Sequence, residues 1–483
     1  MEPPPPTAPS PRVAIIGAGP AGLAAAYELA KAGIGAHVFE ASAQVGGLCR
    51  SIELWGQHVD LGPHRFFSQE RAVNALWLEV VGKAYDMVPR LTRIHYRGRF
   101  FDYPLRIGNA LRQLGPREIV RCGIDYARAQ LRGRGGREET FEDWVSARFG
   151  RRLYEIFFKA YSEKLWGIPC SELSADFAAQ RIKQLDLRAV LRAALVGDRD
   201  KKHRTLVDVF AYPHGGTGTV YERMAAQAVE RGATLHLEAP VASVLVEGGR
   251  VRGVKLRSGE VHACDVVLSS MPLTLLVKGL ADVPAPVLEA AQSLTFRNTV
   301  LVYLEVEGAC FPDNWVYVHS PALAVGRITN FENWSAMPSE RGKSILCLEL
   351  WANVDDPLWR EPDDRLAAIA ERELKATGLV DDARVLGRHV IKIPRSYPVY
   401  RMGYERHVEV IRRHLDGIAG LYALGRYGAF KYNNQDHSLL MGIRAAAAIA
   451  AGQVPDLWSI NSDDAYQEGA VITATGLQPL GAA

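Results

Sequence analysis

The fold is decided by a glycine turn near the start of the chain, Gly17-Ala18-Gly19-Pro20-Ala21-Gly22. The turn follows a short apolar run, Arg12 to Ile16, and opens a helical stretch rich in Ala and Leu, Ala21 to Ala32. A second short strand, Ala36 to Glu40, comes next. Strand, glycine turn, helix and strand in this order are typical of the first unit of a doubly wound sheet that binds a dinucleotide.

Each part of this unit has a physical role in that interpretation. Gly17 permits the tight turn, Gly19 lets the backbone approach a pyrophosphate, and Gly22 lets the helix pack closely on the strand. The free N–H groups at the helix N-terminus face the phosphate charge. Glu40 ends the second strand, where an acid accepts hydrogen bonds from the ribose hydroxyls. The alternative is a glycine-rich turn without a ligand, which the combination of strand, helix and acid disfavours.

A second informative segment lies near the other end of the chain, from Gly425 to Ser438, and reads GRYGAFKYNNQDHS. Its short turns, its arginine and its many amide and hydroxyl donors suit a buried ligand that is anionic or rich in carbonyl groups. We therefore predict that this segment folds back onto the glycine turn and that both hold one long cofactor. We expect that cofactor to be FAD.

The composition is that of an ordinary soluble enzyme. The 483 residues are 48% hydrophobic and 23% charged, and the small formal net charge of +3 gives no reason to expect a nucleic-acid partner. Residues 1–11 are proline-rich and lack the basic and apolar regions of a signal peptide. No run approaches the ~18 apolar residues that a membrane span needs. We predict a cytoplasmic protein with a disordered N-terminal tail.

Cysteines and arginines give two further indications. The six cysteines are scattered without a C-x-x-C pair or metal-ligand spacing, which predicts free, mostly buried thiols, a reducing compartment and no metal site. Arginines crowd residues 106–137. We interpret this stretch first as a solvated helical face with a basic loop, and second as a peripheral contact with anionic lipid or a lipid-linked partner.

Changes of pattern along the chain predict a nucleotide domain that is interrupted by insertions. Residues from about 90 to 230 read as helical and aromatic, short strands return between 233 and 271, and alternating segments from Thr299 to Leu350 predict a larger sheet. The predicted division is a tail at 1–11, the FAD-binding domain at 12–90, 231–280 and 416–452, a mainly helical insertion and substrate domain at 91–230, a substrate-domain sheet at 281–415, and a C-terminal tail at 453–483.

Taken in order, the motifs resemble those of the UDP-galactopyranose mutases, especially their eukaryotic-type branch, and of related bacterial flavoproteins of the protoporphyrinogen-oxidase type. The resemblance covers most of the chain. Besides the two segments above, it rests on Gly46-Gly47-Leu48-Cys49-Arg50-Ser51, Asp60-Leu61-Gly62-Pro63-His64, Tyr103-Pro104, Thr140-Phe141-Glu142-Asp143-Trp144, Lys164-Leu165-Trp166-Gly167-Ile168-Pro169, Tyr212-Pro213-His214-Gly215-Gly216-Thr217-Gly218, Trp315-Val316-Tyr317 and Tyr397-Pro398.

The chain departs from the mutase pattern at two points. It has Gly62-Pro63-His64 where the mutases have Gly-Gly-His, which bears on loop movement next to the flavin. It also has a shorter spacing between Tyr432 and Asn434, which bears on the shape of the sugar pocket.

The resemblance implies an α/β fold with an FAD-binding, Rossmann-like domain of the glutathione-reductase and amine-oxidase type, a helical insertion, and a mixed or antiparallel sheet in the substrate domain. The implied cofactor contacts are Gly17, Gly19, Ala21, Gly22, Glu40, Gly47, Leu48, Arg50, Gly62, Pro63, Val241, Gly425, Arg426, Asn433, Asn434, Gln435 and Ser438.

In such mutases the reduced flavin is a nucleophile: its N5 attacks the anomeric carbon, expels the nucleoside diphosphate and forms a flavin–sugar adduct, so that pyranose and furanose interconvert. Arginines and tyrosyl hydroxyls must hold the expelled diphosphate. The implied substrate contacts are Tyr103, Trp166, Arg181, Tyr317, Arg327, Tyr397 and Tyr432, and the implied catalytic residues are His64, Arg327 and Arg426. The resemblance also implies a nucleotide-sugar partner and a place in cell-surface polysaccharide synthesis. NAD(P)H is a candidate reductant, although the chain has no second fingerprint for it.

Each of these side chains has a simpler structural alternative. The arginines could form surface ion pairs, Tyr317 and Tyr397 could be wall residues, and Trp166 could be core. His64 and His437 could be structural hydrogen-bond partners, and Asp436 reads as a turn or cap residue rather than a catalytic acid.

Two rival functions remain open at this point. The first is an FAD-dependent oxidase or desaturase of a protoporphyrinogen-like or phytoene-like substrate, for which the predicted arginines and tyrosines would have no use. The second is a binding protein without flavin, similar to the Rab-escort and GDP-dissociation-inhibitor proteins, which the intact fingerprint and Glu40 disfavour.

Overall fold

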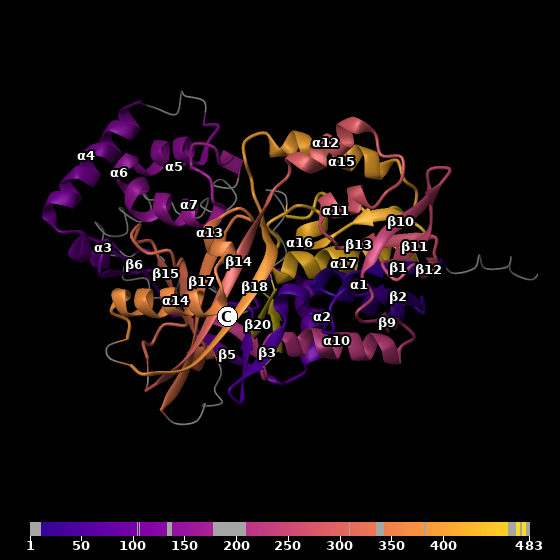
Figure 1. The fold of residues 1–483 in the computed structure, drawn as a ribbon, viewed down its shortest axis with the longest axis horizontal. Coiled ribbons are helices and arrows are strands. Elements are labelled where there is room, and N and C mark those ends of the chain that lie inside the picture. Colours follow the sequence, from indigo (N-terminus) through magenta and orange to yellow (C-terminus); the bar gives the residue numbers. More distant parts are fainter. Residues whose placement is uncertain are drawn as a thin grey trace, which may run out of the picture.

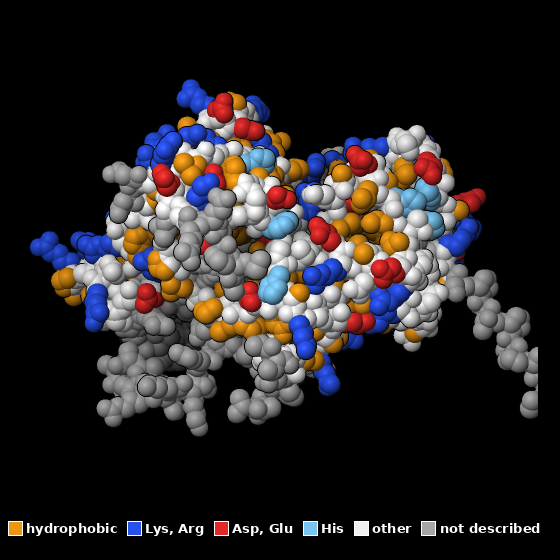
Figure 2. Space-filling view, turned by 90° about the horizontal axis from the view of Figure 1, so that it is seen from below, with side chains coloured by type: hydrophobic (Ala, Val, Ile, Leu, Met, Phe, Trp, Pro, Cys, Tyr) orange, Lys and Arg blue, Asp and Glu red, His pale blue; other side chains and the backbone are white. Residues whose placement is uncertain are grey.

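The computed structural model describes residues 11–103, 105, 107–132, 138–176, 209–308, 310–334, 342–380, 383–461, 470–473 and 476–479. Figure 1 shows two bodies side by side: a small sheet with its helices on the right, and a larger sheet with a group of helices beyond it on the left. Seen from below, Lys and Arg side chains and hydrophobic side chains gather at the left-hand end (Figure 2). Each body is assembled from segments that are distant in the sequence.

The right-hand body is built on a five-stranded parallel sheet in the order β19-β13-β1-β2-β9 (Figure 1). Its strands are β1 (Val13–Ile16), β2 (Ala36–Phe39), β9 (Thr234–His236), β13 (Val266–Ser269) and β19 (Leu421–Ala423). All four pairings are parallel. Strands from beyond residue 230 and from residue 421 therefore complete the sheet that the N-terminal unit begins, as the strand pattern predicts.

Both faces of this sheet are covered, which explains why β1 is apolar throughout. Val13 and Ile15 pack into a core with α1 (Pro20–Lys31), α10 (Gly218–Glu230) and α17 (Gln435–Ala450). Ala14 and Ile16 belong to the core on the other face. That core includes an antiparallel sheet of β10 (Val241–Glu247), β11 (Arg250–Leu256) and β12 (Val261–Ala263).

The left-hand body is built on a seven-stranded sheet in the order β18-β14-β17-β16-β15-β6-β7. Its strands are β6 (Thr92–Tyr96), β7 (Arg99–Asp102), β14 (Phe296–Glu307), β15 (Trp315–Val318), β16 (Arg327–Asn330), β17 (Lys343–Ala352) and β18 (Val385–Pro398). Only the pairing of β15 with β6 is parallel, so the sheet is mixed. The α/β fold class with a mixed substrate sheet is confirmed.

The prediction that residues from about 90 onward are helical is wrong for the first part of this stretch. Residues 92–102 form the β6–β7 hairpin, because Thr92, Ile94 and Phe101 supply buried side chains at strand spacing. Arg97 and Gly98 adopt positive φ at its turn. Strands of four and five residues show too few alternations to be distinguished from the helical segment that follows them.

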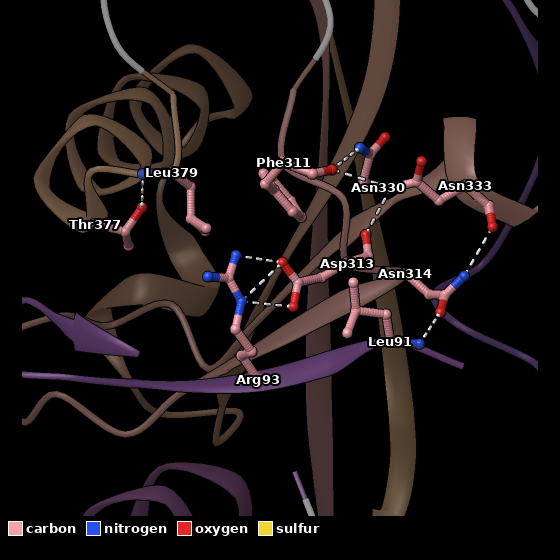
Figure 3. A network of polar contacts seen from close by, with 9 residues as sticks. All are labelled: Leu91, Arg93, Phe311, Asp313, Asn314, Asn330, Asn333, Thr377 and Leu379. Carbon is pink, nitrogen blue, oxygen red and sulfur yellow. Dashed lines mark hydrogen bonds and ion pairs between the residues drawn. The ribbon is translucent and has the colours of Figure 1, made fainter. Parts of the chain in front are cut away.

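A buried polar network fixes β6 against β15, as Figure 3 shows. Nε and Nη2 of Arg93 donate to both oxygens of Asp313, which is fully buried, over 2.5 to 3.1 Å. Asn314 accepts from the Leu91 N–H at 2.7 Å and donates to the Asn333 carbonyl at 2.7 Å. The network sets the register of the parallel pair and with it the position of the side chains at the ends of β7 and β15.

Helices and short hairpins complete the two bodies. The remaining helices are α2 (Arg71–Val81), α3 (Ile107–Leu114), α4 (Pro116–Arg132), α5 (Phe141–Phe149), α6 (Arg151–Tyr154), α7 (Ala160–Trp166), α11 (Leu273–Lys278), α12 (Ala285–Ser293), α13 (Pro357–Arg360), α14 (Asp363–Thr377), α15 (Tyr404–Asp416) and α16 (Gly425–Gly428). The remaining strands are β3 (Ser51–Leu54), β4 (Gln57–Asp60), β5 (Tyr85–Pro89), β8 (Val209–Pro213), β20 (Ala470–Thr473) and β21 (Gly476–Pro479). The β20–β21 hairpin lies in the tail that the sequence pattern left unplaced.

Two sequence-based expectations can be checked at this level. All six cysteines are free thiols and five of them are buried, as predicted. Among the helices that the structure describes, none carries an apolar run long enough to cross a bilayer.

Candidate functional site

The glycine turn has the shape that its sequence predicts. Gly17 has a φ of +96°, which glycine adopts without strain, and its N–H donates to the Phe39 carbonyl. A Cβ on Gly22 would lie 2.0 Å from the Gly17 carbonyl oxygen, so the start of α1 packs tightly against the turn. A Cβ on Gly19 would meet nothing closer than 3.9 Å, which leaves the backbone accessible there. The N-terminus of α1 is therefore shaped to receive a phosphate.

The predicted acid lies directly beside this turn. Glu40 follows β2, and its Oε2 accepts a hydrogen bond of 2.8 Å from the Ala18 N–H. Its Oε1 accepts from the N–H and the hydroxyl of Ser42. The Ala239 N–H donates to the Glu40 carbonyl, which places the segment leading into Val241 next to the acid. Glu40 thus borders the glycine turn, and the contacts of Glu40 with a ribose and of Val241 with the cofactor stay predictions.

The second glycine pair lies on the opposite side of the turn. The Gly46 N–H donates to the Ala18 carbonyl at 2.7 Å, and a Cβ on Gly47 would come within 3.2 Å of the Gly19 Cα. Arg50 follows the short helix Gly47–Cys49, which contains Leu48, and its Nε donates to the Gly47 carbonyl at 3.0 Å. This arrangement leaves no room for a larger residue at Gly47 without moving the glycine turn.

The C-terminal segment folds back onto the same turn, as predicted. A Cβ on Gly425 would lie 3.2 Å from the Ala21 Cβ, and a Cβ on Gly442 in α17 would lie 2.4 Å from the Ala21 carbonyl oxygen. Small residues at these positions let α16 and α17 approach the start of α1 closely. The N-terminal glycine turn and the C-terminal segment therefore meet at one place.

The Gln435 side chain holds a neighbouring loop, and its contact with the cofactor stays a prediction. Its Oε1 accepts a hydrogen bond of 2.7 Å from the Tyr221 hydroxyl, and its Nε2 donates to the carbonyls of His64 and Arg65 at 3.1 and 3.3 Å. The amide is thus engaged by protein at both ends. Gln435 positions the loop that follows Pro63.

The other polar residues of the segment are also engaged by protein. Asn433 is buried, accepts from Asn461 at 2.9 Å, and contacts Met441 through its Nδ2, and its contact with the cofactor stays a prediction. Asn434 is the N-cap of α17, and its N–H donates to His437 Nδ1 at 3.3 Å. His437 thus makes a structural hydrogen bond at the start of α17, as its structural alternative predicts.

Two residues of the first turn of α17 remain. Asp436 lies in this turn, two residues after the N-cap Asn434, where a carboxylate is favoured by the helix N-terminus. Ser438 is buried in the same turn, at the end of α17 that faces α16 and α1.

The loop after β4 brings His64 to the region between the two bodies. Asp60 anchors the loop, since its carboxylate accepts from Ser51 at 2.5 Å, from the Thr217 N–H at 2.9 Å and from Tyr212 at 3.0 Å. The His64 carbonyl accepts from the Thr217 hydroxyl at 2.8 Å. A Cβ on Gly62 would lie 3.4 Å from an oxygen of Glu349, so the loop passes over the large sheet.

The charge state of His64 follows from its surroundings. Burial, together with the positive charges of Arg327 and Arg426, lowers the pKa of His64 to about 3. All three residues predicted as catalytic are thus brought together, with a neutral imidazole between two guanidinium groups.

A row of polar side chains crosses three strands of the large sheet. Tyr317 of β15, Arg327 of β16 and Glu349 of β17 are direct cross-strand partners and therefore share one face. Arg327 donates from Nε and Nη2 to the two oxygens of Glu349 at 2.5 and 2.6 Å. Burial lowers the pKa of Arg327, but the buried carboxylate outweighs it and raises the pKa well above its ordinary value. Arg327 is therefore half of an internal ion pair rather than of a surface one.

Arg426 faces this row from the other body. Its Cζ lies 4.6 Å from the centre of the Tyr397 ring and 4.4 Å from that of Tyr432, and the two rings stack at 5.6 Å. Its Nε and Nη1 donate to the carbonyls of Ser396 and Asn433 at 3.0 and 3.1 Å. These contacts hold a guanidinium against two tyrosines that were both predicted to line the site.

The other predicted substrate residues lie in different surroundings. Trp166 is only 1% exposed and packs behind Tyr397 and Tyr432, which favours its packing alternative over direct contact with a substrate. Tyr103 lies at the rim, with its ring edge-on to Tyr317 at 5.3 Å. Arg181 lies outside the described residues.

Two residues that the sequence did not single out join the constellation. Tyr161 of α7 contacts Tyr317 edge-on at 5.5 Å, and burial raises its pKa while Arg327 partly opposes that rise. Arg65 follows His64 directly, and its Nη1 is sealed from solvent without a hydrogen-bond partner among the described residues. Burial lowers the pKa of Arg65. The sequence feature that could have indicated Arg65 as a site residue is an arginine followed by two phenylalanines, Arg65-Phe66-Phe67.

These observations decide whether the residues fit the predicted FAD. The turn around Gly19 keeps backbone N–H groups accessible at the end of a helix, with Glu40 beside it and Gly47 and Gly425 pressed against it. An acid and an anion-binding helix end at this spacing suit the ribose and pyrophosphate of a dinucleotide. The residues present therefore fit such a group, with the guanidinium of Arg426 farther along.

The comparisons with known proteins agree on the class of fold. The sequence profile of a family described as flavin containing amine oxidoreductase matches residues 20–450. A crystal structure of reduced UDP-galactopyranose mutase superposes with a TM-score of 0.82 and 24% identity, over 92% of this chain and 94% of that one. A putative protoporphyrinogen oxidase from Exiguobacterium sp. 255-15 superposes with a TM-score of 0.72 and 19% identity, over 92% and 100%. Identities this low indicate a shared fold alone.

The curated relatives include both a desaturase and a probable mutase. The chain is 27% identical over 313 residues to a zeta-carotene-forming phytoene desaturase of Myxococcus xanthus, covering 61% of this chain and 60% of that protein. It is 29% identical over 187 residues to a probable UDP-galactopyranose mutase of Klebsiella pneumoniae, covering 36% of this chain and 45% of that protein. In both cases the match spans less than two thirds of the relative.

Proposed function

Since this chain belongs to the family of flavin-containing amine oxidoreductases, we propose that it is an FAD enzyme that interconverts the pyranose and furanose forms of a nucleoside-diphosphate sugar, UDP-galactose or a relative. The cofactor would be held by the glycine turn at residues 17–22, by Glu40 and by the C-terminal segment at residues 425–438. The free thiols support a reducing compartment such as the cytoplasm.

One observation carries the choice of substrate: cationic and hydroxyl groups converge between the two bodies. Arg327 stands in a row with Tyr317, and Arg426 stacks on Tyr397 and Tyr432. A hydrocarbon substrate would make no use of the N–H groups of Arg327 and Arg426 that the protein does not engage, and leaving a buried polar group unpaired costs about 1–3 kcal/mol. A diphosphate would use them as donors.

The ion pair with Glu349 is compatible with this role. An arginine has five N–H groups, and the ion pair engages Nε and Nη2 of Arg327, which leaves Nη1 for a phosphate oxygen. Glu349 also fixes the orientation of the guanidinium, so that little further ordering is needed when an anion binds. Arg65, sealed from solvent nearby, would add a second positive charge on the Tyr317 side.

When bound in its reduced form, the flavin would supply the nucleophile. The chain's own residues would place the sugar nucleotide and retain its diphosphate next to the reacting carbon. Neutral His64 would form hydrogen bonds there without adding charge, because its pKa of about 3 keeps it unprotonated at neutral pH. Trp166 would support the tyrosines from behind.

A second candidate function is an FAD-dependent oxidase or desaturase acting on an apolar substrate. Two observations favour it: the similarity to the phytoene desaturase and the aromatic contacts of Tyr161 with Tyr317 and Trp351. Against it stand the guanidinium groups of Arg65, Arg327 and Arg426, only one of which is matched by Glu349.

Turnover under two redox conditions separates the two functions. Protein reduced anaerobically with dithionite, or with NADPH to test that reductant, is incubated with UDP-galactopyranose and, as a control, UDP-glucose, and the products are separated by chromatography. A mutase converts the sugar without further consumption of reductant. Oxygen uptake by the oxidised protein with a protoporphyrinogen or carotenoid, and no conversion of nucleotide sugars, would establish the rival instead.

The arginine-rich stretch supports a peripheral contact with an anionic membrane. One face of α4 exposes Val120, Ile124 and Leu131. Arg121 and Arg128 flank this face and pair with Glu118 and Asp125 of the same helix. The left-hand end in Figure 2, where α3 and α4 lie in Figure 1, shows this mixture of cationic and apolar side chains. The opposite face of α4 packs into the protein through Cys122. An apolar stripe among arginines suits a helix lying in a lipid headgroup region.

A further inference from the structure

Three histidines from distant parts of the chain gather at one edge of the right-hand body. His37 lies on β2, His236 on β9 and His262 on β12. Ring nitrogens of the three residues lie within 4.8 Å of one another. His37 Nδ1 is 3.1 Å from His236 Nε2. No part of the proposed cofactor or substrate site uses these side chains.

A carboxylate lies next to this cluster. Glu260 Oε1 is 2.9 Å from His262 Nε2, a nitrogen that is enclosed and lacks a well-directed hydrogen bond among the described residues. Glu260 is largely exposed and can turn toward the other rings. Glu238 and Glu260 line a surface hollow together with His236, which gives an ion access from solvent.

We propose that His37, His236 and His262 form a binding site for Zn²⁺, with Glu260 as the fourth ligand. Three imidazoles and one carboxylate are a donor set that suits zinc, whereas magnesium and calcium prefer oxygen ligands alone. Tetrahedral zinc with Zn–N bonds of about 2.0–2.1 Å holds its ligand atoms about 3.3 Å apart. The separation between His37 and His236 already matches that spacing, and small rotations of two partly exposed rings would bring in the third.

The surroundings hold the rings in place. The Phe39 ring stacks on His236 at 4.7 Å with planes 8° apart, and it also contacts His262 at 4.7 Å. These contacts orient two of the three ligands before any ion binds.

A bound ion would add a link between elements that backbone hydrogen bonds and ring packing now connect. His236 ends β9, and its carbonyl accepts a hydrogen bond of 2.9 Å from the Glu40 N–H. Zinc would tie β2 and β9 of the parallel sheet to β12 of the neighbouring sheet. The site would therefore be a structural one that stabilises the region around Glu40.

The test uses untagged full-length protein and zinc ions alone. Equilibrium dialysis measures zinc per chain, and the midpoint of thermal unfolding is recorded with and without zinc. We expect one zinc per chain and a higher midpoint with zinc, because an ion that binds only the folded chain stabilises it. His236→Ala and His262→Ala should each weaken binding at least tenfold, and Glu260→Gln should weaken it less.

A matched control separates this site from general binding to surface histidines. His58→Ala changes an exposed histidine on the β3–β4 hairpin, away from the cluster, and should leave both the zinc content and the zinc-dependent midpoint unchanged. Equal binding by the wild type, His236→Ala and His262→Ala would overturn the proposal, as would the absence of saturable binding in the wild type.

Discussion

Arg327 and Glu349 face each other directly across β16 and β17 and are joined by two hydrogen bonds of 2.5 and 2.6 Å. Glu349 is almost completely buried, so the pair lies in a region of low dielectric constant. A buried carboxylate that loses its partner is costly, and it also repels an incoming anion. The pair therefore couples the stability of the sheet to the proposed binding of a diphosphate.

The first prediction separates these two effects. Arg327→Ala should retain the flavin, lose about 3–5 kcal/mol of unfolding free energy because Glu349 is left unpaired, and lose roughly 2 kcal/mol or more of nucleotide-sugar affinity. The double variant Arg327→Met with Glu349→Gln should recover most of the stability without recovering the affinity. Urea unfolding and calorimetric titration with UDP-galactose measure the two. Wild-type affinity in the double variant would remove Arg327 from the site.

The second prediction concerns Arg65, a half-buried residue whose Nη1 is sealed from solvent without a hydrogen-bond partner among the described residues. Arg65→Met should leave the stability unchanged or raised, because a desolvated charge is removed, and should weaken nucleotide-sugar binding about tenfold, or about 1.4 kcal/mol. Arg372→Met, at a side chain 70% exposed, is the control and should change neither quantity. A large loss of stability with unchanged binding would show that Arg65 is structural.

Sequence patterns correctly predicted single strands and tight turns, because a few adjacent residues determine these features. β10 spans the residues expected for it, and the glycine turn has the predicted shape, because an alternating strand and a positive φ are both properties of a few adjacent residues. The large sheet was only partly predictable. β6 joins it through Asp313, more than two hundred residues away, and no local pattern reports a partner at that distance.

The same distinction applies to the candidate site. The sequence correctly placed His64, Arg327 and Arg426 together, because the family resemblance carried their positions. It did not predict that the Gln435 amide bonds to the backbone of His64, because a polar side chain in a motif does not reveal whether it faces a ligand or a neighbouring loop. The resemblance also gave no weight to Arg65, the residue after His64.

The third prediction tests the close packing of the glycine turn. Gly22→Ala would place a Cβ 2.0 Å from the Gly17 carbonyl oxygen, which must displace backbone and so should lower both flavin content and stability. Gly123→Ala, in α4, meets nothing within 4 Å and should be neutral or stabilising by up to about 1 kcal/mol. Flavin absorbance of the purified proteins and thermal unfolding report the results. Full flavin content in Gly22→Ala would contradict the assigned role of that glycine.

The fourth prediction follows from Asp60, whose pKa burial raises to about 6, although hydrogen bonds from Ser51, Thr217 and Tyr212 partly oppose the rise. The folded chain then binds this proton more tightly than the unfolded chain does. The contribution of Asp60 to stability is therefore fully present below its ordinary pKa of 3.8 and is lost as the pH rises through about 6. The loss is on the order of 2–3 kcal/mol.

Asp60→Asn removes this titration, so the stability of the variant relative to the wild type should increase between pH 4 and pH 7 by roughly that amount. Asp265→Asn is a control of opposite sign, because Arg12 lowers the pKa of that carboxylate to about 2. Unfolding in urea at a series of pH values measures both differences. A constant difference between Asp60→Asn and the wild type would contradict the assigned charge state.

The fifth prediction concerns the exposed face of α4, where Ile124 and Leu131 are 46% and 86% exposed. We expect the protein to sediment with vesicles that contain phosphatidylglycerol and to stay in solution with vesicles of phosphatidylcholine alone, because Arg121 and Arg128 lie among the apolar side chains. High salt should weaken the binding.

The double variant Ile124→Asp with Leu131→Asp should bind at least tenfold more weakly, a loss of about 1.4 kcal/mol or more, since it removes apolar contact and adds negative charge. Val354→Asp, at an apolar residue 71% exposed on another element, should bind as the wild type does. Equal loss in both variants would mean that the charge change alone decides binding, and undiminished binding in the double variant would exclude α4 as the contact surface.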